Sequence, residues 1–381
     1  MSNTNTNVTP KLLAQGLLAL RQRAVMPRLV NRGYESMAAE KGAVVNIPIP
    51  SAITARAVTP SNTMNSNVDS APTTAAVTLD QWYEAPFHLS DKDALETKGL
   101  IPMQASEAIK SIANTIDVNI LSKHTGLYSA AGTAGTTPFA TNINVAITAR
   151  TLLNKDACPP DDRFVVLDPS AEGNALGLSN ILQFDQRGDQ QGIIMGSIGV
   201  KLGMAWYMDQ NIATYTPGTG WASGFIASTV GGAVGDTTLN LINATASGTI
   251  KVGDIFTLVA DTNSQQYVVT AAATVSATVA VAISFKPALK TTVATGGTLT
   301  VVSVPYVPNI VAHRDCFVFA SRPLAGSNVA AGNIFSSPVD PVSGVALRLE
   351  LSRQYKQDTY SYDALWGSGL TRAELGAKIF G

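Results

Sequence analysis

A long helix with a narrow apolar face is the sequence feature that most constrains the fold of this chain. Small and branched apolar residues recur there at steps of three and four, at Ala105, Ala108, Ile109, Ile112, Ala113, Ile116 and Ile120. This spacing is typical of one face of an α-helix. Pro102 suits the first turn, and Gly126 suits the position just past the last turn. About 22 to 25 residues at about 1.5 Å each make a rod of roughly 35 Å. We expect a long structural helix against which other elements pack, rather than a helix that lines a catalytic pocket.

The composition indicates a chain that buries much of its surface against other molecules. The 381 residues are enough for two or three domains. The formal net charge is −1, so no long-range field attracts nucleic acid or an anionic membrane. Charged residues make up 14% of the chain, against about 25% in ordinary soluble domains. Burial against copies of itself is one way for such a chain to stay soluble, although some secreted β-proteins share this composition.

Cysteine usage and the N-terminus favour an intracellular protein. Cys158 and Cys316 are the only cysteines, which predicts two buried thiols rather than a disulfide framework. The segment from Met1 to Thr9 is polar and lacks the basic and then apolar layout of a signal peptide. No apolar run reaches the roughly 18 residues of a membrane span. We expect a protein made and used in a reducing cytoplasm, with no membrane partner.

Two N-terminal segments carry apolar residues but have no evident core. An amphipathic helix from Thr9 is expected to end or kink at Pro27, and its apolar face holds Leu12, Leu13, Leu17, Leu20 and Ala24. Such a short helix cannot bury its leucines alone. Residues 42–80 predict a hairpin with strands at Val44–Pro50 and Val77–Tyr83 and a polar tip at Thr63–Thr74. This hairpin is either a flexible excursion or is stabilised by a neighbouring molecule.

The rest of the chain predicts an α+β part interrupted by a β-rich segment. Helices are expected at 141–155 and 170–176, and strands at 164–167, within 193–207, at 347–351 and at 375–380. From Pro217 to Pro305 charges are scarce, and short strands are expected at 238–242, 254–259, 266–270, 278–284 and 298–304. These strands predict a small all-β barrel or sandwich. The flanking segments 215–218 and 304–308 have the composition of paired hinges around an inserted domain.

Histidine and glycine spacing gives no sign of a catalytic centre. His88, His124 and His313 fit no zinc or metalloprotease spacing, so we expect structural or surface residues. The glycines at 132–137 lack the following lysine of a phosphate-binding loop. Residues 196–199 lack the spacing of a nucleophile elbow.

The paired carboxylates are also explained without catalysis. Asp161 and Asp162 follow two prolines, as turn residues do. Asp91 and Asp93, in a loop with Pro86 ahead of the long helix, suit the first turn of a helix. We therefore predict no enzyme, no catalytic residue, no cofactor and no metal ion. An enzyme built on the α+β part would need a cluster of titratable residues, and the sequence offers none.

The order and spacing of several segments resemble the major capsid (coat) protein of tailed bacteriophages, in the P22-like branch of the HK97 fold. None of them carries the resemblance alone. They are residues 79–82, 86–91, 196–199, 209–211, 253–257, 265–270 and 309–315.

The resemblance implies an α+β HK97-like fold with an inserted β-barrel. It implies an N-terminal arm (1–38), an extended loop (39–85), a peripheral domain with a spine helix (86–139), an axial domain in two parts (140–214 and 307–345), an inserted β-barrel domain (215–306) and a peripheral C-terminal segment (346–381). Some relatives join their subunits by a lysine–asparagine bond. Lys41 lies ahead of the extended loop, but residues 62–70 hold no lysine, so we predict no such crosslink.

The resemblance also implies a function as a shell subunit in the virion, assembled in the host cytoplasm. The expected partners are other copies in pentamers and hexamers, a scaffolding protein, a portal protein and packaged double-stranded DNA held without sequence-specific contacts. The residues expected at contacts between subunits are Leu13, Leu17, Leu20, Ile47, Ile49, Met64 and Trp82. The alternative is a β-rich surface adhesin or another phage structural protein, such as a tube or decoration protein.

Overall fold

The chain divides into two compact units. The first holds residues 1–19, 31–112 and 318–371, and the second holds 20–30, 113–317 and 372–381. The structure, a computed structural model, describes residues 25–33, 44–51, 53, 55, 57–58, 60, 70–92, 100–183, 196–221, 225–227, 231–243, 247–259, 261, 264–277, 279–324, 334–336 and 345–381. The expected helix from Thr9 lies outside these ranges up to residue 24. Pro27 stands in the first turn of a short helix, α2 (Met26–Leu29), because a proline there loses no helical hydrogen bond.

The hairpin of the first unit is formed by β1 (Val44–Ile49) and β2 (Thr73–Thr78), which pair antiparallel over their whole length. The expected returning strand at Val77–Tyr83 is wrong in one respect. It is divided at Leu79 and Asp80, because its first part pairs with β1 and its second part begins β3 (Gln81–Ser90) in another sheet.

The base of this hairpin has an apolar core within its own chain. We call this cluster the hairpin base; it consists of Val45, Ile47, Val77, Leu79, Val318 and Ala320. All six side chains are nearly or fully buried. The prediction that the hairpin has no core is therefore wrong at its base. The sequence pattern missed this contact because Val318 and Ala320 lie more than 200 residues away along the chain.

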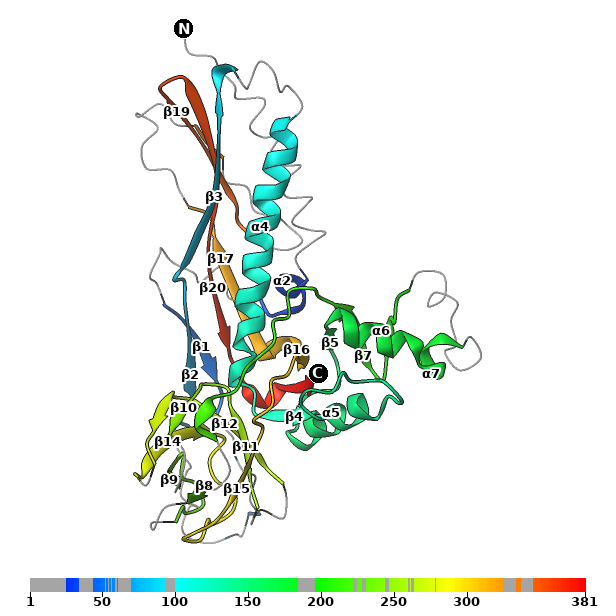
Figure 1. Ribbon diagram of the computed structural model, residues 1–381, viewed down its shortest axis with the longest axis vertical. Coiled ribbons are helices and arrows are strands. Elements are labelled where there is room, and N and C mark those ends of the chain that lie inside the picture. Colours follow the sequence, from blue (N-terminus) through cyan, green and yellow to red (C-terminus); the bar gives the residue numbers. More distant parts are fainter. Residues whose placement is uncertain are drawn as a thin grey trace. The chain divides into compact units, whose positions relative to one another are not determined.

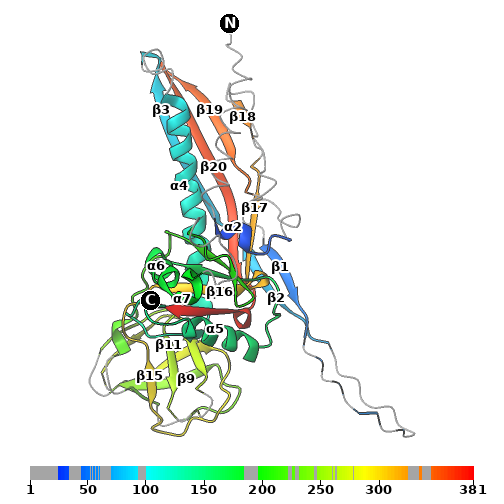
Figure 2. The ribbon, with the colours of Figure 1, turned by 90° about the vertical axis from the view of Figure 1, so that its right-hand side faces the viewer.

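The main sheet of the first unit is built from long antiparallel strands. β20 (Gln357–Leu370) is its centre and pairs with β3, with β19 (Arg348–Gln354) and with β17 (Phe317–Arg322); β18 (Ile334–Ser336) follows β19. Figure 2 shows β3, β20 and β19 side by side. Pro86, expected in a loop, lies inside β3 opposite Ser361. Proline is tolerated there because β3 is an edge strand among the described residues.

The long helix α4 (Leu100–Ser122) lies where the sequence predicts it, and the predicted apolar face is the face that it buries. From Ala105 to Ile120 the predicted residues are buried, apart from the partly exposed Ala108. A short 3₁₀ turn (Lys123–Gly126) follows and ends at the predicted glycine. Asp117 lies on the same buried face and is fully buried, which the apolar spacing did not predict.

The second unit contains a six-stranded mixed sheet. Its strands, in spatial order, are β4 (Ser129–Ala131), β21 (Gly376–Phe380), β16 (Pro308–His313), β5 (Arg163–Leu167), β7 (Met204–Met208) and β6 (Val200–Lys201). The helices α5 (Asn144–Lys155) and α6 (Pro169–Gly177) pack on this sheet, as Figure 1 shows, and α7 (Ser179–Leu182) follows α6. The sheet topology divides residues 346–381, expected as one segment, between β20 of the first unit and β21 here.

The β-rich segment of the second unit forms a second six-stranded sheet. Its order is β15 (Leu299–Val301), β11 (Ile255–Leu258), β12 (Gln266–Val269), β14 (Val281–Lys286), β9 (Thr238–Asn243) and β8 (Phe225–Ala227), beside a ladder of β10 (Gly248–Ile250) and β13 (Ala273–Val275). The edge strands β15 and β8 contact each other, so the sheet is a curled half-barrel. Its core gathers Trp221, Phe256, Tyr267 and Phe285. The expected strands are confirmed; β8, β10 and β13, of three residues each, were missed because such short strands have no readable period.

Candidate functional site

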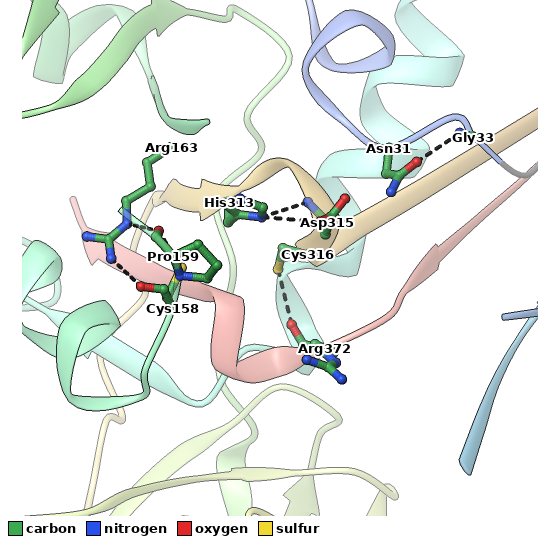
Figure 3. Close-up of polar contacts among 9 residues, drawn as sticks. All are labelled: Asn31, Gly33, Cys158, Pro159, Arg163, His313, Asp315, Cys316 and Arg372. Atoms are coloured by element: carbon green, nitrogen blue, oxygen red, sulfur yellow. Dashed lines mark hydrogen bonds and ion pairs between the residues drawn. The ribbon is translucent and has the colours of Figure 1, made fainter. Parts of the chain in front are cut away.

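The cysteines and two of the histidines are buried in the second unit, and Figure 3 shows Cys158, Cys316 and His313. Cys158 and Cys316 are free, buried thiols, which confirms the prediction. Burial raises the pKa of both thiols, so neither is a reactive thiolate. His313 Nδ1 accepts the backbone N–H of Asp315 at 3.1 Å. His124 is also buried, whereas His88 is an exposed residue of β3 in the first unit.

The aspartates singled out in the sequence have structural partners. Asp162 stands in a turn with a positive φ, and its carbonyl accepts the N–H of Arg314 at 3.2 Å. Asp91 receives two hydrogen bonds from Arg353, at 2.6 and 2.8 Å, which lower the pKa of its carboxyl. Asp91 is the first helical residue after β3, as expected, and its carboxylate also ties this point to β19. Asp93 lies outside the described residues.

Neither a metal-binding cluster nor a membrane-spanning helix is found in the part of the chain that the structure describes. Among these residues, no three His, Cys, Asp or Glu side chains gather to hold a metal ion. None of the helices in the same ranges has the length and apolar character needed to cross a bilayer. The buried carboxylates of Asp117 and Asp254 instead join segments of the chain that are distant in sequence.

The hairpin carries exposed apolar side chains in the first unit. Beyond its base, Ile53 is 72% exposed and Val58 is 83% exposed. Large apolar side chains with this exposure, on a segment that leaves its own core, are typical of a surface that contacts another molecule.

The residues expected at contacts between subunits fall into three groups. Ile47 is buried in the hairpin base, so it already has apolar neighbours in its own chain. Ile49 is partly exposed and Trp82 is 48% exposed, so both have surface to offer a partner. The other four, Leu13, Leu17, Leu20 and Met64, lie outside the described residues. The role of all seven in assembly stays a prediction.

A buried carboxylate holds the start of α2 against α4. Asp117, on α4, accepts the backbone N–H groups of Met26 at 3.2 Å and Val25 at 3.4 Å. Asn211 Nδ2 donates to the same carboxylate at 3.5 Å. Asp209 lies close enough to repel it, and burial is the larger effect; together they raise the pKa of Asp117 to about 8.

The two connections of the β-rich segment meet and pair. Tyr215 and Tyr306 exchange backbone hydrogen bonds of 2.8 and 3.0 Å, and their ring centroids are 5.4 Å apart. This confirms that the two predicted hinge segments lie together. Around them a cluster that we call the joint packs the two sheets of the second unit onto each other; its buried members are Tyr128, Ala130, Ile255, Val268, Tyr306 and Phe380.

Asp254 is the polar centre of this region and was not identified from the sequence. It is 1% exposed. Its carboxylate accepts the Tyr215 hydroxyl at 2.8 Å and the Trp221 indole N–H at 2.6 Å. The backbone N–H groups of Gly218 and Lys251 complete its hydrogen bonds. One carboxylate therefore links the first connection, the short 3₁₀ helix Thr219–Trp221 and the turn ahead of β11.

Solved structures of phage proteins share this fold. A chain of Mycobacterium phage Che8 matches with a TM-score of 0.53 at 14% identity, over 94% of this chain and 91% of that chain. A chain from the capsid structure of the cyanophage P-SCSP1u matches with a TM-score of 0.52 at 10% identity, over 94% and 88%. The sequence matches no protein-family model and no curated protein. The predicted α+β HK97-like capsid fold is thereby confirmed.

Proposed function

We propose that this chain is a major capsid protein, which assembles with copies of itself into the pentamers and hexamers of an icosahedral phage head. The observation that carries the proposal is the fold, which matches a chain of a cyanophage capsid over 94% of this chain. In this function the chain is a structural protein and not an enzyme. It belongs to the virion and is assembled in the host cytoplasm.

The exposed part of the hairpin supports this function. The hairpin base ties β1 and β2 to their own unit, whereas Ile53 and Val58 carry apolar surface away from it. Subunits that assemble permanently bury upwards of roughly 2,000 Å² in apolar interfaces. The hairpin is therefore the extended loop through which one subunit contacts the next, with Ile49, Met64 and Trp82 in the same contact. The N-terminal leucines, Leu13, Leu17 and Leu20, serve a second one.

The finer assignment is a P22-like capsid protein, in which residues 215–306 are an inserted domain. The pairing of Tyr215 with Tyr306 supports it, because a segment that leaves and returns at one point can fold as a module. The other domains are the arm (1–38), the extended loop (39–85), the peripheral parts (86–139 and 346–381) and the axial parts (140–214 and 307–345). Partners are a scaffolding protein, a portal protein and double-stranded DNA, which a chain of net charge −1 holds without a strong field.

Electron microscopy of the purified protein tests this function. The chain is expressed alone and together with a scaffolding protein of the same phage, and the soluble fraction is imaged. Closed icosahedral shells are expected in at least one preparation. Monomers or amorphous aggregates in both would contradict the proposal. Tubes, or a protein found in a surface fraction without particles, would favour the tube or adhesin alternative.

A matched pair of variants tests the role of the hairpin. The double variant Ile53→Ser with Val58→Ser removes the exposed apolar side chains and is expected to abolish shells while leaving a folded subunit. Val234→Ser is the control, because Val234 is 62% exposed in the β-rich segment. Shells from the double variant at the wild-type yield would exclude the hairpin as the contact.

A further inference from the structure

Five buried side-chain polar atoms of the second unit have no hydrogen-bond partner among the described residues, and three of them concern the joint. These three are Nδ1 of His124, the hydroxyl oxygen of Tyr306 and Nζ of Lys378. Lys378 is fully buried, Tyr306 is 2% exposed and His124 is 7% exposed. Each of the three atoms is closed to bulk solvent. A buried polar group without a hydrogen-bond partner costs free energy. The apolar contacts of the joint must therefore offset this cost.

The three groups follow one another along the joint. Lys378, in the middle of β21, places its Nζ 6.0 Å from the centroid of the Tyr306 ring. The Tyr306 ring is next to Tyr215, which in turn meets the His124 ring edge-on at 5.6 Å. These three groups therefore lie along the two connections of the β-rich sheet, whereas the other two unpartnered atoms, of Asp168 and Asp209, belong to residues that directly follow β5 and β7.

The charges around these groups do not neutralise them. Asp254 attracts Lys378 but makes no hydrogen bond to it, because its oxygens are used by Tyr215, Trp221 and backbone N–H groups. His124 faces the positive charge of Lys378. The other titratable group of the joint, Tyr128, is turned toward Asp156 and Glu374.

Burial therefore favours the uncharged forms of both bases. It lowers the pKa of Lys378 to about 7, with Asp254 offsetting part of the effect. Burial, and then the charge of Lys378, lowers the pKa of His124 well below its usual range. A proton taken up by either group would have to be held in a dry site beside another cation.

We propose that the joint is operated by protons: protonation of Lys378 and His124 loosens the packing of Tyr215 and Tyr306 and frees the β-rich sheet to move on its two connections. Opening lets water reach the ammonium and imidazolium groups, so the open state binds protons more tightly than the closed one. A fall in pH shifts the equilibrium toward the open state for this reason. The inference does not depend on the proposed function, because it concerns one subunit.

Hydrogen exchange of the full-length chain, followed by mass spectrometry at pH 8 and pH 6, tests the inference. Rates are corrected for the chemical dependence of exchange on pH. If opening takes up one proton at Lys378, the peptides with Tyr215 and Tyr306 should exchange about tenfold faster at pH 6 than at pH 8. Peptides from β5 and β16, in the sheet beside the joint, are the internal reference and should change much less.

Lys378→Met keeps the apolar stem and removes the charge, so the pH response should fall to what His124 alone contributes, about fourfold or less. Lys290→Met is the matched control, because Lys290 is exposed in the same β-rich segment, and it should respond as the wild type does. An unchanged response in Lys378→Met would overturn the inference. The wild type alone gives a second test that needs no folded variant: equal corrected rates at the two pH values, or an equal change in the reference peptides, would also overturn it.

Discussion

The carboxylate of Asp117 accepts the backbone N–H of Met26 at 3.2 Å, and this contact anchors the start of α2 on α4. The aspartate is fully buried and lies near a second buried carboxylate, Asp209. Burial and this neighbour together outweigh the hydrogen bonds it receives, because the pKa of Asp117 is raised to about 8. The anchor is therefore formed by a carboxyl group that holds its proton at neutral pH.

The raised pKa of Asp117 predicts that stability falls as pH rises. The folded chain keeps this proton up to about pH 8, whereas the unfolded chain loses it near pH 4, so the unfolded state binds fewer protons between these values. The contribution is full below about pH 4 and is lost as pH rises through about 8, and it amounts to several kcal/mol, on the order of 5.

Asp117→Asn tests this dependence. The variant should match the wild type near pH 4 and exceed its unfolding free energy near pH 9, as measured by denaturant unfolding followed through Trp206 and Trp221 of the same unit. Asp161→Asn, in an exposed turn, is the control and should track the wild type throughout. A wild-type and an Asp117→Asn curve that stay parallel over this range would contradict the prediction.

Local patterns in the sequence predicted the elements well where a single period dominates. The three- and four-residue spacing from Ala105 to Ile120 located α4 and its buried face. The same spacing gave no sign that Asp117 is buried, because its partners are backbone groups more than 90 residues away. Pro86 was placed in a loop because proline breaks most strands, and only the pairing of β3 at a sheet edge makes it acceptable.

The candidate site was predictable in its connections but not in its chemistry. The change of composition near Pro217 and Pro305 located the two hinges, which pair at Tyr215 and Tyr306. The sequence did not reveal the roles of Asp254 and the buried Lys378, since neither residue sits in a motif. Their burial results from contacts between segments that are distant in sequence. The hairpin base was missed for the same reason.

Removal of the Asp254 carboxylate should destabilise the β-rich segment strongly. The Trp221 indole N–H would lose its partner inside the protein, and the Tyr215 hydroxyl would keep only the carbonyl oxygen of Val252, at 2.9 Å. We expect Asp254→Ala to cost about 3 to 5 kcal/mol of unfolding free energy. Tyr215→Phe, which removes one hydrogen bond, should cost about 1 kcal/mol. The measurement is denaturant unfolding by Trp221 fluorescence, and similar losses for both variants would contradict a hub at Asp254.

Two arginines of β19 should differ greatly in their contribution to stability. Arg348 binds Asp363 through two hydrogen bonds, of 2.9 and 2.5 Å, and Asp363 is only 3% exposed. We expect Arg348→Ala to cost about 3 to 5 kcal/mol, because it removes the cationic partner of a buried carboxylate, which keeps the hydrogen bond from the Trp82 indole N–H at 2.9 Å. Arg353, on the surface, binds Asp91 with similar geometry, but solvent screens this pair, so Arg353→Ala should have a much smaller effect. Thermal unfolding of the two variants compares them, and equal losses would contradict the prediction.

A methyl group at Gly367 should loosen the hairpin from the first unit. A Cβ there would lie 2.3 Å from the carbonyl oxygen of Thr78, at the end of β2, and this oxygen belongs to the backbone and cannot rotate away. Gly367→Ala should therefore cost about 1 to 3 kcal/mol and make the hairpin more sensitive to proteolysis.

Gly173→Ala is the matched substitution. A Cβ at Gly173, in α6, meets nothing within 4 Å, and alanine is the better helix former by about 0.5 to 1 kcal/mol. Limited proteolysis with mapping of the cleavage sites should show faster cutting within residues 44–78 for Gly367→Ala alone. If both variants were cut in this segment at the wild-type rate, the close approach of β20 to β2 would not hold the hairpin. The attachment would then depend on the apolar hairpin base, where Leu79→Ala should release the hairpin by leaving a cavity.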